Sequence, residues 1–220
     1  MPVSEPGPNR SCIYRNPLSV DKLETNLDDP VDCVYDIFAR SVSKYADKPC
    51  FGDRNLEGPI TYKWLSYGEV SKKVGQIGNL IEEEGLMTTE DRFVGIFSLN
   101  RSEWMITELA INKVGCTTVP ILSYAISSSL IEETKVKTMF VSLKSLEALL
   151  DCKDMFQVKN VICFDSVDEE IKAKCNAKNL KLWHFWDDFC YKKEVEPKSK
   201  FESIYTIAQT SGSTGKPKLA

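Results

Sequence analysis

The chain carries, near its end, Ser203-Ile204-Tyr205-Thr206-Ile207-Ala208-Gln209, followed at once by Thr210-Ser211-Gly212-Ser213-Thr214-Gly215-Lys216-Pro217-Lys218. The first segment is rich in β-branched and aromatic residues, so it predicts a strand. The second segment combines glycine, hydroxyl-bearing residues and lysine, so it predicts a loop at the strand's carboxyl end. Open α/β sheets bind their ligands at the carboxyl ends of the strands, so a loop at this position is typical of that class of fold.

The loop has the composition of a polyphosphate-binding site. Glycines permit positive φ and close approach, so that successive backbone amides can point at an anion. Hydroxyl side chains can donate to phosphate or ligate a magnesium ion, and a lysine adds a compact positive charge. We predict no catalytic residue in this chain and assign no metal ligand. The predicted nucleotide-binding residues are Thr210, Ser211, Gly212, Ser213, Thr214, Gly215 and Lys218.

The loop departs from two common phosphate-binding patterns. A Walker A motif needs four residues between its first glycine and the Gly-Lys pair, whereas here only Ser213 and Thr214 intervene and Pro217 follows the lysine. A dinucleotide fingerprint is absent as well. Composition alone is equally compatible with a flexible Gly/Ser connection.

The preceding chain alternates between apolar runs and amphipathic segments. Unbroken runs of Val, Ile and Phe predict strands that are covered on both faces, which is typical of parallel sheets. The sequence therefore predicts an α/β fold with a mostly parallel sheet flanked by helices. Strands are expected at 93–97, 116–121, 138–141 and 161–164, and helices at 102–114, 127–133, 143–150 and 167–175.

The first part of the chain predicts a separate organisation. Residues 1–29 are expected to form an arm, and residues 30–220 part of one domain. A helix is expected to begin with Asp29 as cap and Pro30 at the first position, and to end at Lys48. Short strands are expected at 50–51 and 60–65, and the capping box formed by Ser66 and Glu69 predicts a second helix that runs to Gly85.

Composition excludes several classes of protein. The net charge is −4, from 28 basic and 32 acidic residues, and no basic stripe predicts nucleic-acid binding. Eight cysteines with a single histidine, His184, do not form a metal-site pattern and are interpreted as reduced thiols of a cytoplasmic protein. The apolar runs are too short to cross a bilayer, although peripheral membrane association stays open.

The segment Thr210–Lys218 closely resembles the signature loop of the adenylate-forming superfamily. Within it, residues 31–220 look most like the long-chain fatty acyl-CoA synthetases, on the segments 62–67, 93–104 and 118–124. Gln209 stands where the family usually has an aromatic residue, and Leu219 where it has glycine.

The resemblance implies the incomplete N-terminal portion of the adenylate-forming fold, ending just after the phosphate-binding loop. It implies a parent enzyme that uses ATP and Mg²⁺ to convert a fatty acid to acyl-AMP and then transfers the acyl group to coenzyme A. Fatty acid, ATP and coenzyme A are the implied partners, with no obligate protein partner. A cytoplasmic location is implied, with the cytosolic face of the endoplasmic reticulum or peroxisome as an alternative. The family's remaining motifs lie beyond Ala220, so this chain alone is expected to be inactive and marginally folded, with the strand after the loop unformed and a sheet edge exposed.

Two other interpretations stay open: a shortened, non-catalytic family member that binds a nucleotide or a partner, and an unrelated phosphate-binding domain.

Structural roles are expected for three further segments. Ser102 is expected to cap a helix under which Trp104 packs, residues 120–124 to form part of the architecture, and His184 to be a packed or surface ring and not a general base.

Overall fold

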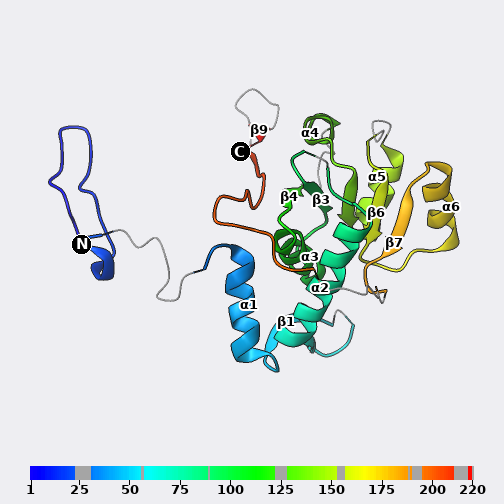
Figure 1. The fold of residues 1–220 in the computed structure, drawn as a ribbon, viewed down its shortest axis with the longest axis horizontal. Helices are drawn as coiled ribbons and strands as arrows, with labels where there is room; N and C mark the ends of the chain where they lie inside the picture. Colours follow the sequence, from blue (N-terminus) through cyan, green and yellow to red (C-terminus); the bar gives the residue numbers. More distant parts are fainter. Residues whose placement is uncertain are drawn as a thin grey trace. The chain divides into compact units, whose positions relative to one another are not determined.

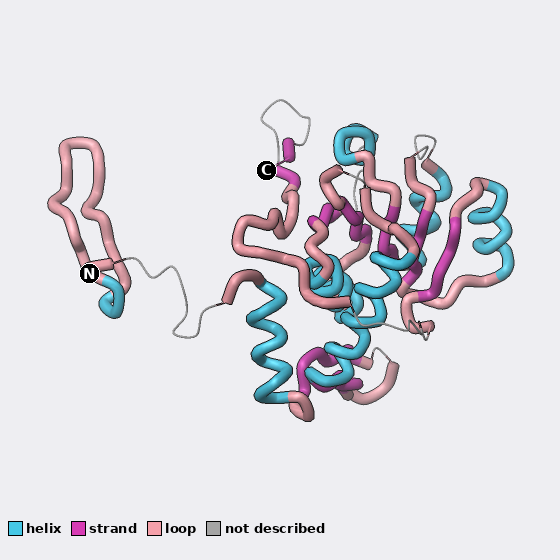
Figure 2. Tube along the Cα trace, viewed as in Figure 1, coloured by secondary structure: helices cyan, strands magenta, loops and turns pink. Residues whose placement is uncertain are grey.

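The computed structural model describes residues 1–22, 31–55, 57–88, 90–121, 128–152, 157–187, 189, 195–210 and 218–219 (Figures 1 and 2). The chain divides into two compact units, Met1–Val31 and Asp32–Ala220. In the first unit, Pro2 forms an antiparallel bridge with Tyr14, and Gly7 with Arg10. A short 3₁₀-helix, η1 (Pro17–Ser19), follows this hairpin-like turn.

The second unit is built on a five-stranded sheet with the order β4-β3-β5-β6-β7. All four neighbouring pairs are parallel, which confirms the predicted α/β class. The strands are β3 (Phe93–Phe97), β4 (Thr117–Pro120), β5 (Thr138–Val141), β6 (Asn160–Cys163) and β7 (Lys181–His184). The expected strands 93–97 and 138–141 have the bounds of β3 and β5, and the expected strands 116–121 and 161–164 differ from β4 and β6 by one residue at each end.

Alternate residues of the strands enter two separate cores, because successive side chains of a strand point to opposite faces. Val94, Phe140 and Ile162 belong to the core beneath α1, α2 and α3, whereas Val141 and Val161 belong to the core beneath α4, α5 and α6. Helices therefore cover both faces of the sheet (Figure 1). They are α1 (Val34–Tyr45), α2 (Tyr67–Glu83), α3 (Ser102–Lys113), α4 (Ser128–Thr134), α5 (Leu143–Asp151) and α6 (Glu169–Ala177).

A small hairpin precedes α2. Its strands β1 (Pro49–Arg54) and β2 (Tyr62–Ser66) pair antiparallel, and both are longer or shifted relative to the strands expected at 50–51 and 60–65. The predicted capping box is confirmed: the Ser66 amide donates to the Glu69 carboxylate at 2.8 Å, and the Glu69 amide donates to the Ser66 hydroxyl at 3.2 Å. These two bonds satisfy amides that would otherwise lack partners at the start of α2.

One expectation about the elements was wrong, and one strand was missed. Helix α1 begins at Val34 and not at Pro30; Asp29 and Pro30 lie outside the described residues. Its start is set by the Asp36 carboxylate, which accepts hydrogen bonds from the amides of Asp32 at 3.0 Å and Cys33 at 3.1 Å. Strand β7 was not predicted, because its four residues include Lys181 and a half-exposed His184 and so lack an unbroken apolar run.

The end of the chain also differs from expectation. Residues 203–209 do not form one continuous strand: Thr206 makes an isolated parallel bridge with Thr118 of β4. The short strand β8 (Gln209–Thr210) follows and pairs antiparallel with β9 (Lys218–Leu219). A strand therefore does form after the loop, contrary to expectation, because β8 offers it hydrogen-bonding partners. The bridge at Thr118 also covers part of the outer edge of β4.

Candidate functional site

Strands β8 and β9 bring the two ends of the predicted phosphate loop together. Thr210 is the register partner of Lys218, and Gln209 is the partner of Leu219. Opposite residues of an antiparallel pair have Cα atoms about 4.5–5.5 Å apart. The structure thus brings together the first and last of the predicted binding residues. The others, Ser211, Gly212, Ser213, Thr214 and Gly215, lie outside the described residues.

The connecting segment (residues 195–207) leads to this hairpin along α2, α3 and β4. The Val195 amide donates to the Asn79 side chain at 2.8 Å, and the Lys198 amide to the Lys113 carbonyl at 2.8 Å. Nearer the loop, the Thr117 hydroxyl donates to the carbonyl of Ile204 at 2.9 Å. Hydrogen bonds to α2, α3 and β4 therefore hold the segment that leads to the loop.

A cavity of about 530 Å³ lies where the strand order reverses. The chain passes from β3 to its neighbour β4 and then crosses to β5 on the other side of β3, so that β3 and β5 adjoin at a topological switch point. Open α/β sheets bind ligands at the carboxyl ends of the strands at such points. The cavity is lined by residues at and after those ends: Phe97, Ser98, Leu99, Asn100, Arg101, Ser142, Lys144, Ser145 and Ala148.

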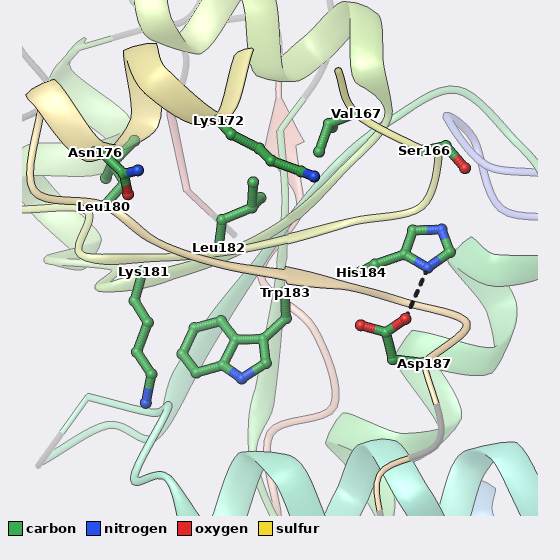
Figure 3. A pocket seen from close by; sticks show the side chains of 10 residues that line it. All are labelled: Ser166, Val167, Lys172, Asn176, Leu180, Lys181, Leu182, Trp183, His184 and Asp187. Atoms are coloured by element: carbon green, nitrogen blue, oxygen red, sulfur yellow. Dashed lines mark hydrogen bonds and ion pairs between the residues drawn. The ribbon is translucent and has the colours of Figure 1, made fainter. Parts of the chain in front are cut away.

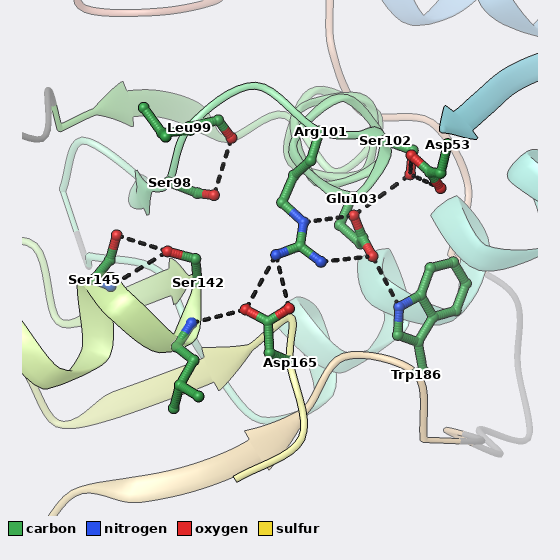
Figure 4. A network of polar contacts seen from close by, with 11 residues as sticks. Asp53, Ser98, Leu99, Arg101, Ser102, Glu103, Ser142, Ser145, Asp165 and Trp186 are labelled. Atoms are coloured by element: carbon green, nitrogen blue, oxygen red, sulfur yellow. Dashed lines mark hydrogen bonds and ion pairs between the residues drawn. The ribbon is translucent and has the colours of Figure 1, made fainter. Parts of the chain in front are cut away.

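Arg101 closes one side of this cavity through a network of polar contacts (Figure 4). Its Nη1 donates to both carboxylate oxygens of Asp165, at 2.9 and 3.1 Å. Its Nε and Nη2 donate to Glu103 at 2.7 and 3.1 Å. Burial by itself would lower the pKa of Arg101, but these two carboxylates raise it. Both carboxylates pair with the Arg101 guanidinium and neutralise its charge. The guanidinium forms part of the cavity wall.

Glu103 extends the network towards β7. Its Oε1 accepts a hydrogen bond at 3.0 Å from the indole Nε1 of Trp186. Burial alone would raise the pKa of Glu103, yet the hydrogen bonds from Arg101 and Trp186 hold it below its usual range. The carboxylate is thus charged and nearly fully buried at the start of α3, where the helix dipole also favours a negative charge.

Ser102 corrects one expectation. It is the first residue of α3 and not its cap, which is Arg101 without a side-chain capping bond. The Ser102 hydroxyl instead donates to the Asp53 carboxylate of β1 at 2.7 Å. Trp104 packs against the core as predicted. The role of Arg101 was missed, because its partner Asp165 is 64 positions away in the sequence.

A second cavity, of about 660 Å³, lies against β7 and α6 at the opposite edge of the sheet from β4 (Figure 3). The His184 Nδ1 lies 3.3 Å from the Asp187 carboxylate. Lys181 binds Glu84 at 2.6 Å and lies 4.5 Å above the Trp183 ring. His184 is thus a half-exposed ring on an edge strand, in agreement with its predicted structural role.

Metal and membrane features can be assessed for the part of the chain that the structure describes. In that part, no group of three or more His, Cys, Asp and Glu side chains is placed to hold a metal ion. No described helix combines the length and apolar character needed to traverse a bilayer. Of the segment 120–124, Pro120 ends β4, whereas Leu122, Ser123 and Tyr124 lie outside the described residues.

Comparison with known proteins assigns this arrangement to a family. The model of the AMP-binding enzyme family matches residues 38–220, so the chain belongs to that family. It is 30% identical to long chain acyl-CoA synthetase 1 of Arabidopsis thaliana over 222 residues, which are 96% of this chain and 33% of the relative. It is 31% identical to long-chain-fatty-acid–CoA ligase 5 of Rattus norvegicus over 206 residues, 85% of this chain and 29% of the relative. The chain thus spans about a third of the length of these long-chain acyl-CoA synthetase homologues.

Solved structures agree on the fold. The adenylation domain of a carboxylate reductase from Mycobacterium chelonae superposes with a TM-score of 0.73 at 20% identity, over 88% of this chain and 34% of that chain. An anthranilate CoA ligase in complex with anthranoyl-AMP superposes with a TM-score of 0.62 at 18% identity, over 87% of this chain and 35% of that chain. The chain therefore has the fold of the adenylate-forming enzymes.

Proposed function

We propose that this chain supplies the ATP-phosphate-binding part of a long-chain fatty acyl-CoA synthetase. The whole enzyme would activate a fatty acid with ATP to acyl-AMP and transfer the acyl group to coenzyme A. The observation that carries the proposal is the β8–β9 pairing, which joins Thr210 to Lys218 at the two ends of the hydroxyl- and glycine-rich loop. Membership of the AMP-binding enzyme family and the long-chain acyl-CoA synthetase relatives support it.

The chemistry explains why such a loop is needed. The fatty acid carboxylate attacks the α-phosphorus of ATP, and the bond to pyrophosphate breaks. This step needs no protein nucleophile, so catalysis depends on holding the reactants in line and neutralising phosphate charge. In the proposal, the backbone amides of residues 211–215 and the hydroxyls of Thr210, Ser213 and Thr214 bind the β- and γ-phosphates. Lys218 adds positive charge, and Mg²⁺ would bind with the nucleotide.

These 220 residues are expected to bind Mg²⁺-ATP without turning it over. The cytoplasm is the proposed location, with peripheral contact to the cytosolic face of a membrane as part of the same proposal.

Calorimetric titration of Mg²⁺-ATP into the chain tests the proposal. Gly212→Val with Gly215→Val should weaken binding at least about tenfold, since side chains at these positions would obstruct the approach of amides to phosphate. Gly58→Ala is the control: Gly58 has a positive φ, of 78°, and lies in the turn between β1 and β2, away from the loop in sequence. Equal affinity of the double variant and the parent would refute the proposal. Formation of acyl-CoA from oleate, ATP and coenzyme A by these residues alone would refute the expected inactivity.

A further inference from the structure

The cavity where the strand order reverses, the switch-point cavity, combines apolar walls with hydrogen-bond donors. Its volume of about 530 Å³ lies within the range of about 300–1,000 Å³ that is typical of small-molecule sites. Phe97, Leu99 and Ala148 give it apolar walls, and serine and asparagine side chains add polar groups. None of its described lining residues is acidic. The cavity is therefore suited to an apolar group and contains no described acid in its lining that would repel an anion.

Lys144 brings a positive charge to the switch-point cavity. Its side chain is exposed, so a ligand can reach it, and among the described residues its ammonium forms no ion pair and no hydrogen bond. Arg101, the other cation of the lining, is bonded by contrast to Asp165 and Glu103. Lys144 is the second residue of α5, whose first turn contains no acid. Because the helix dipole disfavours a cation at this position, an anion beside Lys144 would offset that unfavourable interaction.

A pair of serine hydroxyls at the start of α5 leaves one proton without an acceptor (Figure 4). The Ser142 hydroxyl donates to the Ser145 hydroxyl at 2.9 Å and accepts a hydrogen bond from the Ser145 amide at 3.3 Å. The hydroxyl proton of Ser145 has no acceptor among the described residues. Ser145 lines the cavity with 7% of its surface exposed. A buried donor without an acceptor is unfavourable, so an acceptor oxygen of a ligand would stabilise this group.

We propose that the switch-point cavity binds an amphiphilic oxyanion, that is, a carboxylate or phosphate group joined to an apolar chain. Lys144 neutralises the oxyanion, the Ser145 hydroxyl donates a hydrogen bond to it, and the chain contacts Leu99 and Ala148. The cavity lies at the carboxyl ends of β3 and β5, where open α/β sheets bind ligands, which agrees with this role. This site is additional to the phosphate loop, and it does not rest on the proposed function.

Calorimetric titration of the chain with four probes separates the contribution of the charged head from that of the apolar chain. Decanoate and decyl phosphate carry both parts, decanol lacks the charge, and inorganic phosphate lacks the chain. We expect decanoate or decyl phosphate to bind at least about tenfold more tightly than decanol and inorganic phosphate, because only the amphiphilic anions combine a charge-assisted contact with apolar burial. The tighter of the two identifies the headgroup as a carboxylate or a phosphate.

Three variants of the lining locate the binding. Lys144→Ala should weaken binding of the tighter amphiphile about tenfold and leave decanol unchanged, since only the charged contact is lost. Ser145→Ala should weaken it about fivefold, because one net hydrogen bond is lost, while the Ser145 amide still donates to Ser142. Ala148→Trp fills the cavity from an exposed helix position, so it should weaken the amphiphile and decanol alike without lowering the unfolding midpoint. Lys44→Ala is the matched control: Lys44 is an exposed lysine of α1 without an ion pair among the described residues, and its loss should change nothing.

Equal affinity for the two anions and decanol would overturn the proposal. Unchanged binding in both Lys144→Ala and Ala148→Trp would also overturn it, since amphiphiles that merely coat exposed apolar surface give that result. An equal loss in Lys44→Ala would do the same. Gly212→Val with Gly215→Val should leave amphiphile binding unchanged, so a failure of the phosphate loop to bind Mg²⁺-ATP is read separately from a failure of this site.

Discussion

Arg101 and Asp165 lie 64 positions apart in the sequence, yet the Arg101 Nη1 donates to both oxygens of the Asp165 carboxylate, at 2.9 and 3.1 Å. The same carboxylate accepts a hydrogen bond at 2.8 Å from the amide of Leu143, the first residue of α5. Asp165, which follows β6, thus contacts both Arg101, which follows β3, and the first residue of α5. Its loss would leave a cation and an amide without this partner.

Asp165→Ala is therefore expected to destabilise the fold. Groups left unsatisfied beneath a partly exposed side chain cost about 1–3 kcal/mol. Urea unfolding followed by tryptophan fluorescence measures the loss. Lys172→Ala is the control, because Lys172 pairs with Glu169 in a solvent-exposed contact and the variant should leave the free energy of unfolding nearly unchanged. A loss in Asp165→Ala no greater than in the control would contradict the role of the Asp165 carboxylate.

Two acids of α3 should give the stability opposite dependences on pH. The pKa of Glu103 in the folded chain lies below the ordinary value of 4.5, because the Arg101 bonds outweigh burial. Its stabilising contribution is therefore present above pH 4.5 and is lost as the pH falls through the folded pKa. Burial instead raises the pKa of Glu108, so its contribution falls as the pH rises above 4.5 towards the folded pKa.

Urea unfolding of the parent and two variants between about pH 3.5 and 7.5 tests these signs. Glu103→Gln should be less stable than the parent at neutral pH, with a difference that shrinks in acid. Glu108→Gln should become more stable relative to the parent as the pH rises. Parallel pH profiles for the parent and both variants would show that neither carboxyl group is shifted as described.

Gly115 allows a close approach of the connecting segment to the turn after α3. Its φ is 66°, and a Cβ atom there would lie 3.2 Å from the Lys198 Cβ and 3.3 Å from the Lys198 carbonyl carbon and oxygen. Gly85 has a similar φ of 60° but no atom within 4 Å of such a Cβ. Gly85→Ala should cost about 1 kcal/mol from backbone strain alone. Gly115→Ala should cost measurably more in thermal or urea unfolding; equal losses would show that the Lys198 backbone moves aside freely.

The buried thiols should resist alkylation. Burial raises the pKa of Cys116 to about 11 and that of Cys163 to about 11, and the thiolate is the reactive form. At pH 8, iodoacetamide should modify the half-buried Cys12 at least about tenfold faster than either buried thiol, as measured by peptide mass spectrometry. In unfolding concentrations of urea the three rates should converge. Equal rates in the folded chain would mean that the cores open readily.

The sheet was predictable because its strands are buried on both faces. Phe93–Phe97 and Thr138–Val141 read as unbroken apolar or β-branched runs, and the structure gives them the predicted bounds. The same reasoning failed for β7, whose Lys181 and His184 lie at an edge where burial is incomplete. It also failed at the start of α1, where Asp36 provides the capping carboxylate from inside the helix.

The candidate site could be proposed from the sequence where its chemistry is local. The loop composition predicts that Thr210 and Lys218 bind phosphate, and the structure makes them register partners, while their role in binding stays a prediction. The cavity at the switch point was not predicted, since it depends on the β4-β3-β5 order, which chain order alone does not reveal.

The pairing of Gln209 and Thr210 with Lys218 and Leu219 holds the two ends of the segment 211–217 next to each other. The free-energy cost of bringing the ends together is then met by the protein before any ligand arrives. An anion that binds there would not have to bring the two ends of the segment together. Glycines inserted into the segment 211–217 would therefore weaken anion binding, mainly because they lower the local concentration of hydrogen-bond donors around the ligand. This loss is expected even when both strands and every native residue are kept.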